Sequence, residues 1–307
     1  LARFEGYRDP GAAHLDEVEL VTGVPPAEAL EGVIAGEFAY TNYIPRDRMP
    51  GLFADEAWRS YVQSITQPHC QYLLANGREG RLSDARVRRA IAHAIDRPRL
   101  VERFGSSAIA IPAEGLVPPS CPGHDPALRG PAHDVELARR LVDESGYDRR
   151  RPIDLVLVDG AWTLGREAVE GLVADLAAIG LRAEPRAVTD LERTLEVGEF
   201  DLLEAAWYGP YLDPDAFTFG VFHSRLGYYP GLYASRDLDA MLEAARGTID
   251  PQLRARLYRD VHERFAELCP AIVLFHRRHF ILQSPHVEGV QMYPVLPTVR
   301  PRDVWVE

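Results

Sequence analysis

The sequence predicts an α/β protein long enough for about two domains. The chain has 307 residues, of which 46% are hydrophobic, so it can bury a sizeable core. Its 24 prolines and 24 glycines favour a loop-rich α/β architecture over a helical bundle. Segments 153–158, 163–179 and 181–188 have the patterns of a strand, an amphipathic helix and a strand. At that length they predict two parallel strands joined by a right-handed crossover.

Composition and charge argue against several classes of function. The formal net charge is −12, which makes nucleic acid an unfavourable partner. The sequence contains no lysine, so neither a P-loop lysine nor a Schiff-base lysine is available. Cys70, Cys121 and Cys269 form no CxxC pair; they allow one disulfide bridge at most and favour buried or free thiols. No nucleophile–base or zinc-protease motif is present, so we expect neither an enzyme nor a cofactor.

The first quarter of the chain predicts several short elements. Polar and apolar residues alternate over 15–22, which indicates a strand. A short helix is expected at 25–35, closed by Gly36. Further strands are expected to begin at G-E-F-A-Y, residues 36–40, and to cover 61–65 and 71–75.

The stretch from Arg81 to Val101 predicts a helix with a defined start and end. Ser83 or Asp84 can serve as the N-cap, and Pro98 ends the run. Because Arg88 lies on the side opposite the apolar stripe, we expect it to be largely exposed. The apolar stripe at helical spacing consists of Val87, Ala90, Ile91, Ala94 and Ile95.

The rest of the chain alternates between helices and buried strands. The Pro-rich passage 109–131 is expected to be irregular chain packed on a surface. A helix is expected at 134–145, with Asp134 as its N-cap and Gly146 at its end. The remaining expected elements are strands at 200–207, 270–275 and 280–282 and helices at 213–222, 238–246 and 251–268.

Two stretches carry a resemblance to a known family. D-x-R-V-R-R-A-I-A-x-A-I-D-R, residues 84–97, resembles a signature of the family 5 extracellular solute-binding proteins. This group holds the oligopeptide- and dipeptide-binding components of bacterial ABC importers. D-V-E-L-A-R-R-L-V-D-E-S-G-Y, residues 134–147, is similar to a further helix of the family. The matching segments occur in the same order as in the family, and the resemblance covers nearly the whole chain.

The resemblance implies a two-lobed, periplasmic-binding-protein-like (type II) α/β fold that traps a ligand by hinge closure. Residues 1–76 and 280–307 would form part of lobe I, and residues 77–279 would form lobe II. The chain opens in mid-pattern, so we expect the fold to be truncated at the N-terminus. The two lobe crossings would be Asn76–Leu82 and His276–Gln283, which we expect to lie side by side.

The strongest candidate site is W-Y-G-P-Y-L-D-P, residues 207–214, where a strand leads into an aromatic loop. This loop resembles the pattern W-x-x-D-Y-x-D/E-P of the peptide-binding members of the family. In those members the first acid of the pattern anchors the peptide's α-amino group. This chain has Pro210 in that place. Asp213 precedes a proline, and taken alone this favours a structural role as a helix N-cap. From the resemblance we expect the ligand-binding residues to be Trp207, Tyr208, Tyr211, Asp213, Asn42, Tyr43 and Asn76.

The resemblance therefore predicts a monomeric solute-binding protein that works with an ABC permease, outside the cell or anchored in its envelope. Proline cannot pair with an ammonium group, so we expect unmodified peptides to bind poorly. A sugar, a metal chelate, an opine-like compound and a blocked peptide remain as ligand classes. The alternative is an intracellular ligand-sensing domain of a transcriptional regulator that carries the same module. Such a domain would be cytoplasmic, and the module itself would not bind nucleic acid.

Overall fold

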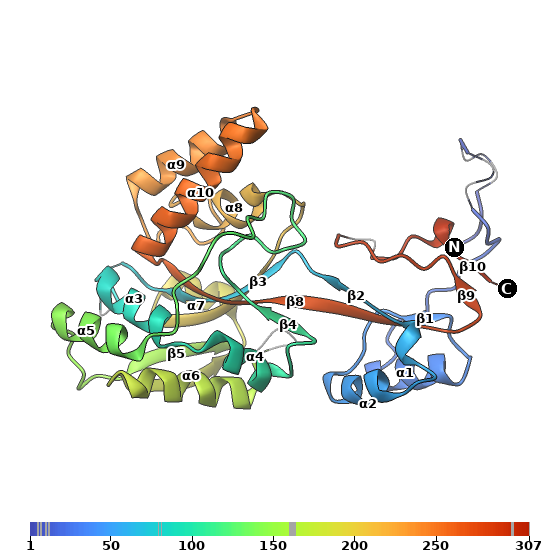
Figure 1. Cartoon of the computed structure of the whole chain (residues 1–307), viewed down its shortest axis with the longest axis horizontal. Helices are drawn as coiled ribbons and strands as arrows, with labels where there is room; N and C mark the ends of the chain where they lie inside the picture. The colour runs from blue at the N-terminus through green and yellow to red at the C-terminus, as the bar shows by residue number, and fades with distance from the viewer. Residues whose placement is uncertain are drawn as a thin grey trace. The chain divides into compact units, whose positions relative to one another are not determined.

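The computed structural model describes residues 1–4, 6, 8–9, 11, 13–78, 80, 82–159, 164–295 and 298–306 (Figure 1). The chain forms two compact units. Unit 1 consists of Leu1–Gln67 with Arg278–Glu307, and unit 2 is Pro68–Arg277. The lobe boundaries expected from the resemblance, after residues 76 and 279, stay a prediction and do not coincide with the boundaries of these units.

Unit 2 is built on a mixed sheet with the strand order β8-β3-β7-β5-β6. β5 pairs in parallel with both β6 and β7, which confirms the predicted parallel pair. β3 runs antiparallel to β7 and to β8, and the short β4 also pairs with β8. The bounds are β3 His69–Ala75, β4 Ala110–Pro112, β5 Ile153–Val158, β6 Ala183–Val188, β7 Leu202–Tyr208 and β8 Ala271–Gln283.

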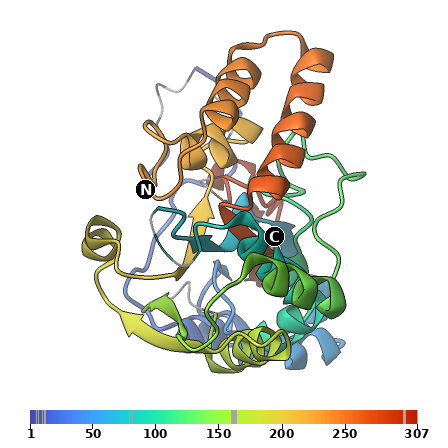
Figure 2. The same cartoon turned by 90° about the vertical axis from the view of Figure 1, so that its left-hand side faces the viewer.

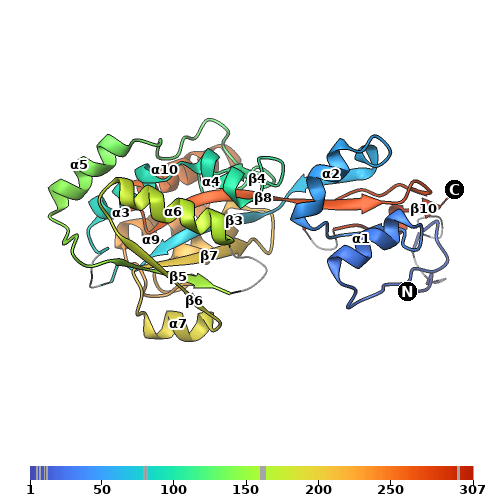
Figure 3. The same cartoon turned by 90° about the horizontal axis from the view of Figure 1, so that it is seen from below.

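Helices cover both faces of this sheet. α9 and α10 lie on one side, and α4, α5 and α6 lie on the other (Figures 1 and 2). The short α7 follows β6 and lies beside that edge of the sheet (Figure 3). The bounds are α3 Ala85–Ala94, α4 Arg97–Phe104, α5 Val135–Ser145, α6 Arg166–Ala178, α7 Leu191–Val197, η3 Pro214–Phe217, α8 Phe219–Phe222, α9 Arg236–Gly247 and α10 Pro251–Leu268.

The residues predicted to begin and end these helices do so in the structure, except at Pro98. Asp84 caps α3 by accepting a hydrogen bond from Arg86 N, and Asp134 caps α5 by accepting one from Leu137 N. Gly146 ends α5 in the left-handed conformation (φ 69°), which glycine adopts without a steric penalty. Pro98 lies in the first turn of a new helix, α4, so the stretch 81–101 forms two helices. Prolines are tolerated there because the first-turn N–H has no helical partner.

Helix α3 confirms the predicted stripe and corrects one prediction. Ile91 and Ile95 are fully buried. Arg88, expected to be exposed, is 1% exposed. Its Nε donates to the carbonyls of Leu268 (3.1 Å) and Cys269 (3.0 Å), and its Nη1 donates to those of Leu82 and Ser83. The last carbonyls of α10 have no helical N–H partner, so a buried guanidinium satisfies them and complements the negative end of that helix.

Unit 1 contains short elements around the second half of β8. Residues 278–282 of β8 pair with β2, and 282–283 pair with β1. The helix expected at 25–35 is present as α1, and Gly36 after it has a positive φ. The bounds are α1 Pro26–Ile34, β1 Tyr40–Thr41, η1 Arg46–Arg48, α2 Met49–Ala54, η2 Arg59–Tyr61, β2 Val62–Thr66, β9 Val287–Glu288, η4 Pro301–Asp303 and β10 Trp305–Val306.

Two predictions in this part of the chain are wrong. Segment 15–22 is not a strand and forms only one isolated bridge, between Glu17 and Ala2. Leu15 packs against a buried cluster of unit 1, but Leu20 and Val21 are more than half exposed, so the alternating pattern does not lie along a core. The strand beside residues 278–282 is β2 and not Asn76–Leu82. Because β3 runs antiparallel to β8, its end at Ala75 lies at the beginning of β8, where Ala75 N donates to Pro270 O (3.0 Å).

Among the described residues, no helix combines the length and the apolar character that a membrane crossing requires.

Candidate functional site

A pocket forms in unit 2 where two parallel strands separate. β5 and β7 pair at Leu155↔Leu202 and Val156↔Leu203, and their ladder ends there. β5 stays with β6 as far as Val158, while β7 continues beside β3 as far as Tyr208. The carboxyl ends of parallel strands that diverge are a usual place for ligand crevices.

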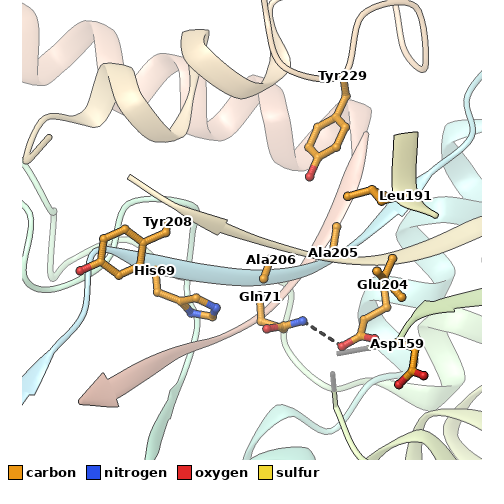
Figure 4. A pocket seen from close by; sticks show the side chains of 10 residues that line it. His69, Gln71, Asp159, Leu191, Glu204, Ala205, Ala206, Tyr208 and Tyr229 are labelled. Carbon is orange, nitrogen blue, oxygen red and sulfur yellow. Dashed lines mark hydrogen bonds between the residues drawn. The ribbon is translucent and has the colours of Figure 1, made fainter. Parts of the chain in front are cut away.

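The pocket has a volume of about 280 Å³. Its walls combine aliphatic and aromatic side chains with four polar ones (Figure 4). The lining residues are His69, Gln71, Val158, Asp159, Leu191, Glu204, Ala205, Ala206, Tyr208 and Tyr229.

The register of β3 and β7 explains how the polar residues meet. His69 is opposite Tyr208, and Gln71 is opposite Ala206. Alternate residues share a face of a sheet, so Gln71 and Glu204 are diagonal neighbours. Gln71 Nε2 donates to Glu204 Oε1 over 2.9 Å (Figure 4). Both side chains are buried, with Glu204 2% exposed.

Burial controls the charge of these groups. It raises the pKa of Glu204 to about 7, and the nearby amide of Leu164 and the charge of Arg277 offset that shift only in part. Burial, Arg277 and His276 hold the pKa of His69 well below its usual value, so His69 is neutral at physiological pH. Asp159 lies at the exposed side of the pocket.

Trp207 and Tyr208, both predicted to bind ligand, point to different faces of β7. Tyr208 lines the pocket, and burial raises its pKa. Trp207 is opposite Cys70 in the ladder, and its indole Nε1 donates to Ala216 O over 2.7 Å. The indole ring also packs against Tyr228, with the ring centroids 5.1 Å apart. Of the two, only Tyr208 reaches the pocket.

The loop that carries Tyr211 and Asp213 is an internally bonded network. Asp213 caps η3 by accepting from Asp215 N (2.8 Å), which confirms its structural interpretation. Arg254 donates to both carboxylate oxygens of Asp213, over 2.9 and 2.7 Å. Tyr211 OH donates to Asp215 Oδ2 over 2.8 Å, and burial together with that contact raises the pKa of Tyr211 to about 12. The helix expected at 213–222 is two short pieces, η3 and α8.

The other three predicted residues lie elsewhere. Asn42 and Tyr43 follow β1 in unit 1, and both are exposed. Asn76 follows β3, and its Nδ2 donates to the carbonyls of Gly198 (2.8 Å) and Phe200 (3.0 Å). His69 begins β3 at the other end, roughly 20 Å away at about 3.3 Å per residue. These bonds give Asn76 a structural role in holding the loop before β7.

The motifs of the sequence did not single out His69, Gln71 or Glu204. The signal was present, because each is a polar residue inside a buried strand: H-C-Q-Y-L-L-A for β3 and L-L-E-A-A-W-Y for β7. Charged residues are rarely buried without a reason.

The described residues contain no cluster of three or more His, Cys, Asp or Glu side chains that could hold a metal ion. Cys70, Cys121 and Cys269 are free, buried thiols, as the sequence favours.

Comparison with solved structures defines the class of fold. The protein HbpA2 from Haemophilus parasuis superimposes with a TM-score of 0.80 at 22% identity, over 92% of this chain and 56% of that chain. The fold is that of the periplasmic binding proteins.

Sequence comparison then identifies the family. The model for the middle portion of the bacterial extracellular solute-binding proteins, family 5, matches residues 1–228, and the chain belongs to this family. Di/tripeptide-binding protein 2 of Pseudomonas aeruginosa is 30% identical, over 72% of this chain and 42% of the relative. The glutathione-binding protein GsiB of Salmonella paratyphi A is 25% identical, over 95% of this chain and 58% of the relative. The chain thus spans about half the length of these curated relatives.

Proposed function

We propose that this chain is the ligand-binding part of a solute-binding protein that captures a small solute between two lobes and delivers it to an ABC permease. Unit 2 would correspond to lobe II, and unit 1 would correspond to part of lobe I. The protein would act outside the cell or in its envelope. Membership of the extracellular solute-binding family and relatives named for binding peptides or glutathione support this proposal.

The observation that carries the proposal is the pocket at the end of β7. It combines apolar walls with a small number of buried polar groups, which is the usual composition of a small-molecule site. Tyr208, which a strand holds in place, supplies an aromatic surface there. No observation in the described part of the chain favours the regulator alternative.

The loop after Trp207 narrows the ligand class. Pro210 has neither a charge nor an N–H donor, so it offers no partner to an α-ammonium group. Asp213 is already engaged by Arg254 and by the Asp215 amide. A ligand that depends on an α-amino anchor in this loop would therefore leave a buried charge unpaired, at a cost of about 3–5 kcal/mol. We infer that unmodified peptides are poor ligands at this loop.

The proposal is tested with the full-length gene product. Mass spectrometry of small molecules released on denaturation identifies the solute, and calorimetric titration then compares Tyr208→Ala with Ile249→Ala. Ile249 is 94% exposed and serves as the control. We expect Tyr208→Ala to weaken binding at least about tenfold, since a well-packed aromatic ring contributes roughly 1–3 kcal/mol. A protein that binds no small solute, or a Tyr208→Ala variant that binds as tightly as the control, would contradict it.

A further inference from the structure

Glu204 has one carboxylate oxygen without a hydrogen-bond partner among the described residues, and the Leu164 amide is the backbone donor that acts on the carboxyl group. Oε1 accepts the hydrogen bond from Gln71, whereas Oε2 is buried and accepts no hydrogen bond from the described residues. Figure 4 shows the carboxyl group within the pocket, between Gln71 and Asp159. Glu204 is therefore a deeply buried acid that presents an acceptor to the pocket.

Two other buried acids of unit 2, Asp175 and Asp215, form ion pairs with arginines, whereas Glu204 forms no ion pair with the described residues. Asp175, 5% exposed, forms an ion pair with Arg99. Asp215, 6% exposed, accepts the hydrogen bond of Tyr211 and lies 3.7 Å from the Arg246 guanidinium. A buried carboxyl with an unsatisfied oxygen costs stability. Positions that carry such a cost are characteristic of binding sites.

The charge of the pocket indicates what would satisfy Glu204. Two carboxyl groups, Glu204 and Asp159, line it. No arginine is among its described lining residues, and the charge of Arg277 on β8, beside the pocket, offsets the effect of burial on Glu204 only in part. His69 in the wall is neutral for the reason given above. We propose that the pocket binds a positively charged arm of the solute, an ammonium or guanidinium group that donates to Glu204. This inference rests on the proposed function and specifies the solute's chemistry.

The depth of Glu204 favours a linear cationic arm over an α-ammonium group. An α-ammonium stands on a branched carbon, so the peptide backbone and a side chain would have to enter the pocket with it. A volume of about 280 Å³ corresponds to roughly nine water molecules at about 30 Å³ each. That space is ample for an unbranched aminoalkyl or guanidinoalkyl chain, and the 2% exposure of Glu204 favours a charged group that reaches it on such a chain.

Protonation of Glu204 should make the binding of a cation depend on pH. The pKa of Glu204 is about 7, so its carboxylate is mostly ionised at pH 8 and mostly protonated at pH 6. Of the groups around it, Arg277 of β8 is an arginine and therefore a permanent cation. His69 of β3 stays neutral, and burial keeps the phenols of Tyr208 and Tyr229 neutral. Asp159, after β5, is the remaining carboxyl. Binding of a cation should therefore weaken about tenfold from pH 8 to pH 6.

The test uses two matched probes on the full-length gene product. Nα-acetyl-lysine methylamide carries a linear ammonium arm, and Nα-acetyl-norleucine methylamide is its uncharged counterpart. Calorimetric titration at pH 8 should show the lysine probe binding at least about tenfold more tightly to the wild type. Glu204→Gln keeps the shape and the Gln71 contact and should remove that preference. Glu184→Gln, which removes an exposed acid from β6, should keep it.

Three results would overturn the inference: equal affinity for the two probes, no binding of either probe by the wild type, or a lysine preference that survives in Glu204→Gln. The pH series on the wild type is a second readout that needs no variant to fold. Unchanged lysine affinity between pH 6 and pH 8 would also contradict it. If the natural solute still binds and depends on Tyr208 in any of these cases, the proposed function stands and only the cationic arm is refuted.

Discussion

Glu204 and Asp213 are two acids on either side of Trp207, and their surroundings are opposite. Asp213 is saturated: both of its oxygens accept from Arg254, and it caps η3. Glu204 is more deeply buried, and only one of its oxygens is bonded within the described chain. The difference shows that an acid at a position resembling a family motif can be structural. An acid outside the motif can instead be the one available to a ligand.

The largest expected effect concerns the pH dependence of stability at Glu204. Its pKa rises from an ordinary value of 4.5 to about 7 in the folded protein, so the folded state holds this proton more tightly than the unfolded chain. The contribution is fully present below about pH 4.5 and is lost as pH rises through 7, on the order of 3 kcal/mol in total. Urea denaturation at pH 5 and pH 8 should show this loss in the wild type and in Glu184→Gln. Glu204→Gln should show a smaller loss; an unchanged difference would mean that Glu204 titrates normally.

The next effect concerns Asp213. We expect Asp213→Ala to lower the free energy of unfolding by about 2–3 kcal/mol, because it removes an N-cap and leaves Arg254 without its carboxylate. Asp134→Ala is the matched control, since Asp134 caps α5 in the same manner through Leu137 N (2.8 Å). It should cost about 1 kcal/mol. Equal costs for the two variants would show that the Arg254 pair contributes nothing beyond the cap.

The smallest effect concerns Tyr211, which is 45% exposed. Tyr211→Phe removes the hydroxyl that donates to Asp215 and should cost about 1 kcal/mol in denaturation at pH 7. Tyr43→Phe is a control on an exposed tyrosine of unit 1 and should have no measurable effect. A Tyr211→Phe variant as stable as that control would mean that the loop does not need this bond.

Local patterns predicted much of the fold. The strand–helix–strand unit at 153–188, the Asp134 and Gly146 helix ends and the buried Ile91 and Ile95 all depend on residues close in sequence. These signals survive because tertiary contacts reinforce them.

The features that the sequence did not predict depend on contacts between residues far apart in the chain. Arg88 is buried because the carbonyls that accept its hydrogen bonds, at Leu268 and Cys269, come from a helix end far along the chain. Likewise, only the pairing of β3 with β7 brings Gln71 to Glu204. The periodicity of a helix or a strand predicts the face on which a residue lies. It does not predict which residue from a distant part of the chain will contact that face. The resemblance directed attention to the loop after Trp207, whereas the pocket lies on the other face of the same strand.

The most direct test compares Asp213→Asn with Glu204→Gln in the full-length gene product, measuring both stability and affinity for the natural solute. If Asp213 is structural and Glu204 receives the ligand, Asp213→Asn should lower the free energy of unfolding and leave affinity within about twofold. Glu204→Gln should weaken binding at least about tenfold, equivalent to roughly 1.4 kcal/mol, without loss of stability at pH 8. The reverse pattern, with affinity lost on Asp213→Asn and retained on Glu204→Gln, would contradict the account and place the cation partner in the loop after Trp207.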